Sequence, residues 1–419
     1  MVPNGWEVKP LSNITKWSSG GTPSKNNPDY WNGEIPWISA ASMRGHYFEN
    51  SELKISDLAV SNGAKMAPKN SLLLLVRGSM LWNKIPVGIA ARKVSFNQDV
   101  KCLVPHADEL TTEFLLYWFL TYEHRLMNMV TGTGIGAGKL DTTDLQGLDV
   151  FLPPLPEQRK IAQILSTWDR CIATTEKLID ISKQQKKALM QQLLTGKKRL
   201  VDPETGKAFE GEWEEVKLGD LGKTFTGLTG KTKEHFGRGS KYIPYINIFR
   251  NSSVDMNALE LVDVRPSEKQ NLVKYGDIFF TTSSETPEEV GMSSVILEEV
   301  DESVYLNSFC FGFRSHNFNR VKPEFIRYLL RSEKVRRSIS LLAQGATRYN
   351  LSKTQLLKIT LNIPSLGEQQ KIASVLTTAD KDIELLEAKL AYFKQEKKAL
   401  MQQLLTGKRR VMVAETEAA

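Results

Sequence analysis

The chain has 419 residues, too many for one ordinary hydrophobic core, so two or three domains are predicted. Its longest aliphatic run, Leu72 to Val76, is too short to cross a bilayer, and its first residues lack a signal-peptide pattern. The net charge of +7 allows a polyanionic partner without requiring one. Three cysteines without CxxC spacing and five scattered histidines predict a cytoplasmic protein without a metal site.

The sequence contains an internal repeat with two copies of one unit. The Trp-Glu segment at Trp6 recurs at Trp213, and the Pro-x-Leu-x-Glu-Gln segment at Pro153 recurs at Pro364. The twelve residues from Lys186 to Lys197 recur verbatim from Lys397 to Lys408, at an offset of 211. The earlier part of each copy drifts in both residue identity and spacing. Each copy therefore consists of a variable globular part, here called a head, followed by a nearly invariant tail.

Each tail is predicted to be one long helix. Residues 157–194 contain neither proline nor glycine, and Thr195-Gly196 ends the run. At 1.5 Å per residue this helix is roughly 57 Å long. Apolar residues recur in heptads in the same register in both tails, which predicts a coiled coil between them. The predicted interface residues are Ile161, Leu165, Trp168, Ile172, Ile179, Leu189 and Leu193 in the first tail, and Ile372, Leu376, Ile383, Leu386, Leu390, Phe393, Leu400 and Leu404 in the second. The alternative is two separate amphipathic helices, each lying on its own domain.

The heads are predicted to be α+β domains, each with a curved or barrel-like sheet and long loops. Short strand-like segments recur between turn clusters, and one helix follows them in each copy. The predicted strands are 72–76, 87–90, 100–104 and 150–152, then 242–246, 277–281, 293–297 and 309–313, and the predicted helices are 112–130 and 323–342. The predicted domains are a first head (1–152), a central helix (153–199), a linker (200–212), a second head (213–363), a C-terminal helix (364–410) and a disordered tail (411–419).

The sequence lacks the motifs of several common chemistries. The glycines from Gly132 to Gly138 do not form a phosphate-binding loop, because Thr133 stands where the first glycine is required and Leu140 follows Lys139. They also follow a helix rather than a strand, which argues against a dinucleotide fingerprint. Pro153-Pro154 lacks the flanking residues of an adenine methyltransferase motif. We interpret the glycine segment as a flexible loop that can approach a polyanion.

The paired repeats resemble the specificity subunit of type I restriction-modification systems. The resemblance rests on the Trp-Glu-x-Val-like start of each half, the Pro-x-Leu-x-Glu-Gln-x-Lys-Ile-Ala segment and the Lys-Lys-Ala-Leu-Met-Gln-Gln-Leu-Leu-Thr-Gly-Lys tail, and it extends over the chain up to Arg410. It implies two target-recognition domains related by pseudo-two-fold symmetry, and two tails that form an antiparallel coiled coil and set the spacing between them. Such a chain would bind double-stranded DNA at a bipartite, non-palindromic site and perform no chemistry itself.

The resemblance also implies partners. Two modification subunits would carry S-adenosylmethionine and methylate adenine, and restriction subunits that use ATP and magnesium would join for cleavage. No cofactor is expected on this chain. The alternatives are a stand-alone DNA-binding or scaffold protein built from the same repeat, and an enzyme with an unrecognised site.

Basic and polar residues in the predicted loops are the candidates for DNA contact. Arginine can bond guanine through two hydrogen bonds, asparagine can bond adenine in the same way, and lysine can bind a phosphate. Arg77 and Arg348 are the strongest candidates, because each lies in a loop at the end of a strand or helix. For each candidate, a solvated surface position is the alternative. The full set is Arg44, Arg77, Asn83, Lys84 and Lys139 in the first head, and Lys231, Lys233, Asn247, Arg250, Arg348, Tyr349 and Lys353 in the second.

Overall fold

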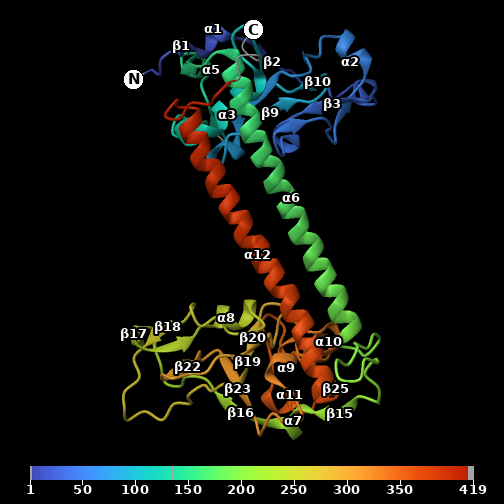
Figure 1. Ribbon diagram of the computed structural model, residues 1–419. Helices are drawn as coiled ribbons and strands as arrows, with labels where there is room; N and C mark the ends of the chain where they lie inside the picture. The colour runs from blue at the N-terminus through green and yellow to red at the C-terminus, as the bar shows by residue number, and fades with distance from the viewer. Residues whose placement is uncertain (1, 135, 414–419) are drawn as a thin grey trace. The chain divides into compact units, whose positions relative to one another are not determined.

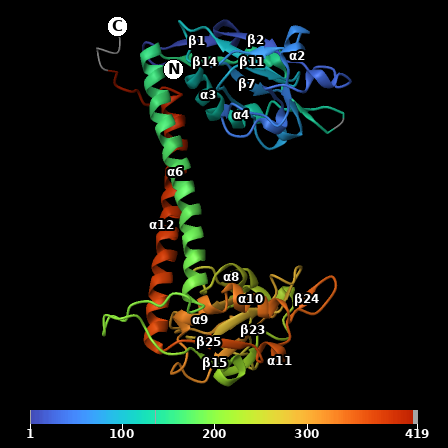
Figure 2. The ribbon, with the colours of Figure 1, turned by 90° about the vertical axis from the view of Figure 1, so that its right-hand side faces the viewer.

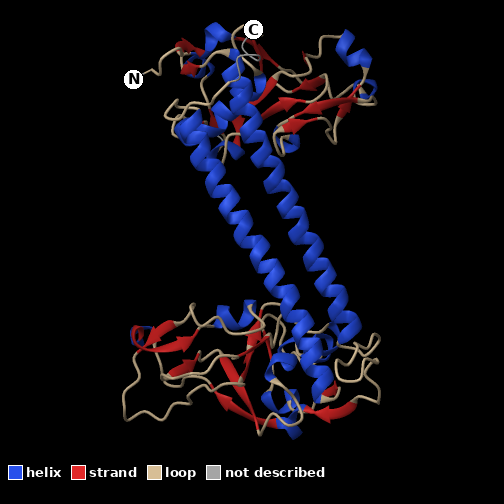
Figure 3. Cartoon of the chain, in the orientation of Figure 1, coloured by secondary structure: helices blue, strands red, loops and turns tan. Residues whose placement is uncertain are grey.

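The computed structural model describes residues 2–134 and 136–413 (Figure 1). The chain divides into two compact units: unit 1 holds residues 1–176 and 388–419, and unit 2 holds residues 177–387. Each unit contains one head together with half of each long helix, α6 (Leu155–Leu193) and α12 (Leu366–Leu404). Figure 3 shows strands in the heads and helix alone along α6 and α12.

Two sheets form the body of the first head. A five-stranded sheet has the order β2-β11-β7-β9-β4, and a four-stranded sheet has the order β5-β3-β10-β6. Strand β7 is buried along its whole length, because all four of its leucines pack into the core. The strands are β2 (Thr15–Ser19), β3 (Ile35–Ile38), β4 (Tyr47–Phe48), β5 (Lys54–Ile55), β6 (Met66–Ala67), β7 (Leu72–Leu75), β9 (Val87–Ala90), β10 (Val94–Phe96) and β11 (Val100–Pro105).

Short helices and two small sheets complete this head. Strand β1 pairs with β14 at the base of α6, and a three-stranded sheet has the order β12-β13-β8. The strands are β1 (Glu7–Pro10), β8 (Arg77–Gly78), β12 (Thr131–Gly132), β13 (Gly138–Lys139) and β14 (Asp149–Leu152). The helices are α1 (Leu11–Ile14), α2 (Asp57–Ser61), α3 (Thr112–Thr121), α4 (Glu123–Met127) and α5 (Thr142–Gln146), with 3-10 turns η1 (Pro28–Tyr30), η2 (Ala40–Ser42) and η3 (Ser79–Trp82).

The second head repeats this plan. The sheet β16-β23-β19-β21 corresponds to β2-β11-β7-β9, and the pair β15-β25 corresponds to β1-β14. A three-stranded sheet β18-β17-β22 and the pair β20-β24 complete it. The strands are β15 (Glu214–Lys217), β16 (Gly222–Thr226), β17 (Phe236–Ile243), β18 (Glu260–Val262), β19 (Ile278–Thr281), β20 (Ser283–Ser284), β21 (Ser293–Val295), β22 (Val304–Leu306), β23 (Cys310–Ser315), β24 (Tyr349–Asn350) and β25 (Thr360–Ile363).

The helices of the second head are α7 (Leu218–Leu221), α8 (Tyr245–Arg250), α9 (Pro323–Leu329), α10 (Glu333–Ser340) and α11 (Lys353–Leu356), with the 3-10 turn η4 (Lys233–His235). The strand predicted at 242–246 is wrong in its second half, because the chain turns into α8 immediately after Pro244. The proline occupies the N-cap position, where its missing N–H removes no helical hydrogen bond.

The two single helices predicted behind the strands are each divided in the structure. The first breaks at Tyr122, between α3 and α4. The second breaks around Ser332, whose backbone is extended and whose hydroxyl donates to the carbonyl of Leu329 at 2.6 Å. A serine hydroxyl that bonds to nearby backbone competes with helix continuation, and this competition accounts for the break between α9 and α10.

The ends of the long helices belong to the cores of the heads. In unit 1, Ile161 and Leu165 of α6 and Leu404 of α12 join the main hydrophobic cluster of the first head. In unit 2, Leu193 of α6 and Ile372 and Leu376 of α12 join that of the second. The boundary between the compact units therefore falls near the midpoint of each long helix, whereas the predicted domain boundaries lie at the ends of these helices. The predicted C-terminal tail is described only as far as residue 413; residues 414–419 lie outside the described part of the chain.

Candidate nucleic-acid interface

Two basic side chains of the first head meet on one small sheet. Arg77 of β8 lies directly opposite Lys139 of β13 in an antiparallel pair, and both are exposed. Side chains at opposite positions of such a pair lie on the same face of the sheet. The next pair in register is Gly78 with Gly138, and a Cβ atom on Gly138 would lie 2.7 Å from Val130 Cγ1. The glycine thus leaves room for the Val130 side chain beside β13, and the strand register places Arg77 opposite Lys139.

An aromatic side chain holds the hairpin between β12 and β13. Trp82, at the end of η3, is 47% exposed, and its indole Nε1 donates to the carbonyl of Gly136 at 3.1 Å. Asn83 and Lys84 follow it, and both are exposed. Residue 135, which lies between β12 and β13 in the sequence, is outside the described residues. Arg77, Lys139, Trp82 and the two residues after it therefore form one surface of the first head, here called the first-head hairpin surface.

The second head places a hairpin at the equivalent position. Ser284 of β20 lies opposite Tyr349 of β24, and Gln344 forms a bridge with Asn350 that closes the hairpin. Arg348 is exposed next to Tyr349, which is half-buried. Lys353 lies further back, with its ammonium 5.6 Å from the ring centre of Phe311. Arg348 and Tyr349 therefore define the second-head hairpin surface, with Ser284 buried opposite Tyr349, and these residues differ from those of the first.

Two predicted contact residues have structural roles instead. The side-chain amide of Asn247 is buried and donates to the carbonyls of Asp255 and Ala258, while its oxygen accepts from the Asp255 N–H. The Lys231 side chain is only 1% exposed and forms an ion pair with Glu268 at 2.5 Å. The polar atoms of both side chains are therefore bonded to other loop residues and are not free to contact DNA, so we remove both residues from the candidate set. Sequence reasoning missed this because the partners lie 8 to 37 residues further along the chain.

The remaining candidates are exposed at other places. Arg44 follows η2, Lys233 lies in η4, and Arg250 ends α8. The structure brings none of these three into the hairpin surfaces described above.

Two arginines that the sequence did not single out fix the loops of the second head. Arg331 donates to the backbone carbonyls of Ile248, Asn251 and Ser293 at 2.7–2.8 Å. Arg336 donates to the carbonyls of Glu288, Val290 and Gly291 at 2.6–2.8 Å. Burial lowers the pKa of each guanidinium to about 10, so both remain charged at neutral pH. Arg336 holds the loop between β20 and β21 in place, and Arg331 joins β21 to the C-terminal end of α8.

The long helices pack antiparallel, as the ion pairs within each unit show. In unit 1, Asp169 of α6 contacts Lys397 of α12 at 2.5 Å, and Glu176 contacts Lys394 at 2.7 Å. In unit 2, Lys183 contacts Glu387 at 2.6 Å, and Lys186 contacts Asp380. The partner's residue number falls as the residue number along α6 rises, which is the mark of antiparallel helices.

The predicted interface residues lie on the buried side of these helices. Ile161, Leu165, Ile179, Leu193, Ile372, Leu376, Ile383 and Leu404 are buried, and Trp168, Ile172, Leu189, Leu386, Leu390, Phe393 and Leu400 are half-buried. The Trp168 and Phe393 rings meet edge to face, with centroids 5.6 Å apart.

The contacts that join the helices to the heads repeat at the sequence offset of 211. Tyr117 donates to Asp169 at 2.8 Å in unit 1, and Tyr328 donates to Asp380 at 2.7 Å in unit 2. Glu157 receives two hydrogen bonds from Arg410, each at 2.7 Å. Glu368 receives two from Arg199, at 2.6 and 2.7 Å. The offset seen in the sequence is therefore an offset between equivalent contacts, so the two tails have the same length between them.

The described residues contain no group of three or more His, Cys, Asp or Glu side chains that could hold a metal ion. None of the described helices is long and apolar enough to cross a membrane.

A family model described as the type I restriction modification DNA specificity domain matches residues 3–182 and again 210–394. The chain therefore belongs to the family of type I restriction-modification specificity subunits, which are not catalytic. It is 28% identical over 422 aligned positions to the MjaVIII specificity subunit of Methanocaldococcus jannaschii, with 98% of this chain and 94% of that protein covered. It is 32% identical to the EcoR124I/EcoR124II specificity subunit of Escherichia coli over 165 residues, which cover 39% of this chain and 41% of that protein.

Solved structures share the fold. The crystal structure of the S subunit from M. genitalium has a TM-score of 0.56 at 16% identity, covering 96% of this chain and 97% of that one. A chain from a structure titled for complex assembly and conformational transition of the type I R-M system has a TM-score of 0.60 at 15% identity, covering 98% and 100%. The arrangement of two α+β heads and two long helices expected from the sequence is confirmed.

Proposed function

We propose that the chain reads a bipartite, non-palindromic DNA sequence, with one half-site contacted by each hairpin surface. The observation that carries this proposal is the equivalent placement of β8-β13 and β20-β24 in two heads whose hairpin residues differ. Equivalent surfaces suit one kind of ligand, and different residues suit different base sequences. In the first head, Arg77 is our candidate for a base contact, and Lys139 and Lys84 are candidates for phosphate contacts.

We further propose that the chain directs adenine methylation, or cleavage, by partner subunits in the cytoplasm. In this proposal S-adenosylmethionine, ATP and magnesium bind to the partners, and two modification subunits bind each chain. Repeated exposed apolar residues support the stoichiometry: Ile181 of α6 is 39% exposed, and Tyr392 of α12, at the offset of 211, is 56% exposed. Two equivalent surfaces suit two identical partner copies.

Mapping of methylated bases in a host genome tests the proposal. Cells that express the chain together with a modification subunit from the same host should carry methyladenine in one two-part motif. Replacing residues 1–152 by the first head of another family member should change one half of the motif and leave the other intact. A motif that changes in both halves, or a chain that methylates DNA without any partner, would contradict the proposal.

A further inference from the structure

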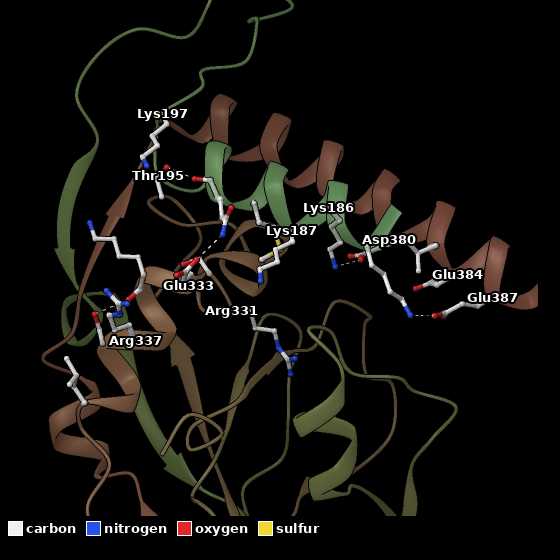
Figure 4. Close-up of a pocket in the computed structure, with 18 residues that line it drawn as sticks. Lys186, Lys187, Thr195, Lys197, Arg331, Glu333, Arg337, Asp380, Glu384 and Glu387 are labelled. Carbon is white, nitrogen blue, oxygen red and sulfur yellow. Dashed lines mark hydrogen bonds and ion pairs between the residues drawn. The ribbon is translucent and has the colours of Figure 1, made fainter. Parts of the chain in front are cut away.

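Unit 2 contains a cleft between its second head and its halves of the long helices. The C-terminal part of α6, the middle of α12 and the segment that includes α10 line an open cleft of about 1310 Å³ (Figure 4). Seven lysine or arginine residues line it, against four aspartate or glutamate residues. The cleft is therefore basic, and its basic groups come from both the helices and the head.

Ion pairs neutralise only part of this charge. Lys183 and Lys186 are matched by Glu387 and Asp380. Arg331 bonds only backbone carbonyls, so its charge is not neutralised by a carboxylate among the described residues. Lys187 and Arg337 are exposed, and neither forms an ion pair within the described residues. An excess of positive charge thus remains, although Glu333 and Glu384 also line the cleft.

The basic wall of this cleft occurs in only one half of the chain. The helix residues Lys183, Lys186 and Lys187 recur at 394, 397 and 398 in unit 1. The head residues do not recur, because Arg331, Lys334 and Arg337 correspond at the same offset to Leu120, Glu123 and Leu126. Two identical protein partners would need the same surface in both halves. A wall present once therefore argues against a docking site for such partners, and its excess of positive charge suits the phosphates of a duplex, which are the same in every sequence.

The cleft is connected to the second-head hairpin surface. Helix α10, which supplies Arg337, runs directly into the hairpin that carries Arg348. Arg331, which lines the cleft, also holds the end of α8 through the carbonyl of Asn251. Figure 2 shows α8, α10 and β24 on the same side of unit 2, with β24 farther from the long helices than α10. A duplex that lies on the hairpin would therefore pass the mouth of the cleft.

We propose that this cleft binds backbone phosphates of duplex DNA beside the half-site read by the second head. Lys187 and Arg337 are the contact groups, and Arg331 adds positive charge behind them. The inference rests on the proposed function, because it takes DNA as the ligand of the second-head hairpin surface. It adds that the two heads hold the DNA backbone unequally, since the first head lacks this wall.

The test measures the salt dependence of DNA binding by the full-length chain. Fluorescence anisotropy would follow binding to a labelled duplex that carries the methylated motif, at several salt concentrations between 50 and 200 mM. The slope of log K against log salt is negative, and each lost phosphate contact reduces its magnitude by about 0.9. The double variant Lys187→Ala, Arg337→Ala should therefore reduce the magnitude of the slope by about 1.8 and leave the recognised motif unchanged. The matched control is Lys398→Ala, the repeat equivalent of Lys187, which should leave the slope nearly unchanged.

Other outcomes overturn the inference in distinguishable ways. An unchanged slope in the double variant shows that the cleft does not bind DNA. If the double variant then also loses a partner subunit in native mass measurements, the cleft is a protein-docking site instead. Failure of the wild-type chain to bind any duplex would overturn the proposed function as well. Thermal melting of each variant checks folding, which we expect to be preserved because both side chains are exposed.

Discussion

Lys397 and Asp169 form an ion pair 2.5 Å long, and the Tyr117 hydroxyl donates to the second oxygen of the same carboxylate. The Lys397 ammonium also lies 5.5 Å from the centre of the Tyr117 ring. One carboxylate on α6 thus joins the C-terminal helix to α3 of the first head. The same three-residue arrangement, formed by Lys186, Asp380 and Tyr328, occurs in unit 2.

The first prediction concerns the stability of this joint. Asp169→Asn removes the anion beside Lys397, whose side chain is only 13% exposed. Because Asp169 itself is 39% exposed, solvent screens the pair, and we expect a loss of about 1–2 kcal/mol in the free energy of unfolding. Urea unfolding would measure it. Lys394→Gln breaks an exposed ion pair and should cost about 0–1 kcal/mol. A larger loss in this control than in Asp169→Asn would contradict the prediction.

The second prediction concerns base recognition. Arg77→Ala should relax base choice at one half-site and weaken binding of the wild-type motif by about 1–3 kcal/mol. Lys139→Ala, which changes the residue opposite Arg77, should weaken binding of all sequences alike. Binding assays with duplexes changed at single positions separate the two effects. If Arg77→Ala also acts equally on every duplex, Arg77 contacts a phosphate and our assignment is wrong.

The third prediction treats the helices as a ruler. Four residues inserted after Lys183 would lengthen α6 by about 6 Å. Lys183 pairs with Glu387, so a matching insertion at Glu387 in α12 is needed to keep the antiparallel contacts. With DNA rising about 3.4 Å per base pair, the gap in the methylated motif should grow by one or two base pairs. A double-insertion chain that still methylates with the original gap would show that the helices do not set the spacing.

The fourth prediction concerns the number of partners. Ile181→Glu and Tyr392→Glu each place a charge on one of two equivalent exposed apolar positions. Native mass measurement should find one modification subunit lost in each single variant and two lost in the double variant. Gln184→Glu, an exposed change on the same helix, is the control and should retain both. Loss of both copies from a single variant would indicate that the two sites are not independent.

The fifth prediction concerns acid pH. The hydrogen bond from Lys231 lowers the pKa of Glu268 from 4.5 to about 2. A carboxyl group whose pKa is lower in the folded state stabilises the fold above its unfolded pKa, and this stabilisation is lost as the pH falls. Glu268→Gln should therefore lower the urea midpoint at pH 7, and its difference from wild type should shrink as the pH falls from about 4.5 to 2. Glu302→Gln breaks an exposed ion pair with Lys241 and should have a smaller effect at pH 7. A difference at pH 2 as large as that at pH 7 would argue against the pair as the cause.

The sequence predicted the long helices and several strands well, because their signals are local. The absence of proline and glycine from 157 to 194 leaves only one regular structure that fits the heptad pattern, and Gly196 ends it with a φ of 72°. Strand β9 was predicted with its observed bounds, Val87–Ala90. The division of the two helices behind the strands was missed, because the extended backbone at Ser332 is set by the hydrogen bonds of that site.

The candidate site was harder to predict because it depends on pairs of distant residues. Nothing in the local sequence places Arg77 opposite Lys139, which lies 62 positions later; the strand register does so. Similarly, Asn247 and Lys231 resemble exposed polar loop residues until their partners are known. Arg331 and Arg336 belong to a segment predicted only as helix, and their carbonyl partners lie 38 to 83 positions away.

The repeated ion pairs have a consequence for a chain of half the length. Residues 1–211 contain Asp169 and Lys186, Glu176 and Lys183, and Glu157 and Arg199, which are the repeat equivalents of both members of each pair. Two such half-chains could therefore form every one of these contacts with each other, as a homodimer. The apolar contacts between the long helices would be weaker, because Trp168 would face Ser182 in place of Phe393. A gene cut to its first half would then encode a symmetric reader of a palindromic site, with an underfilled seam between its two copies.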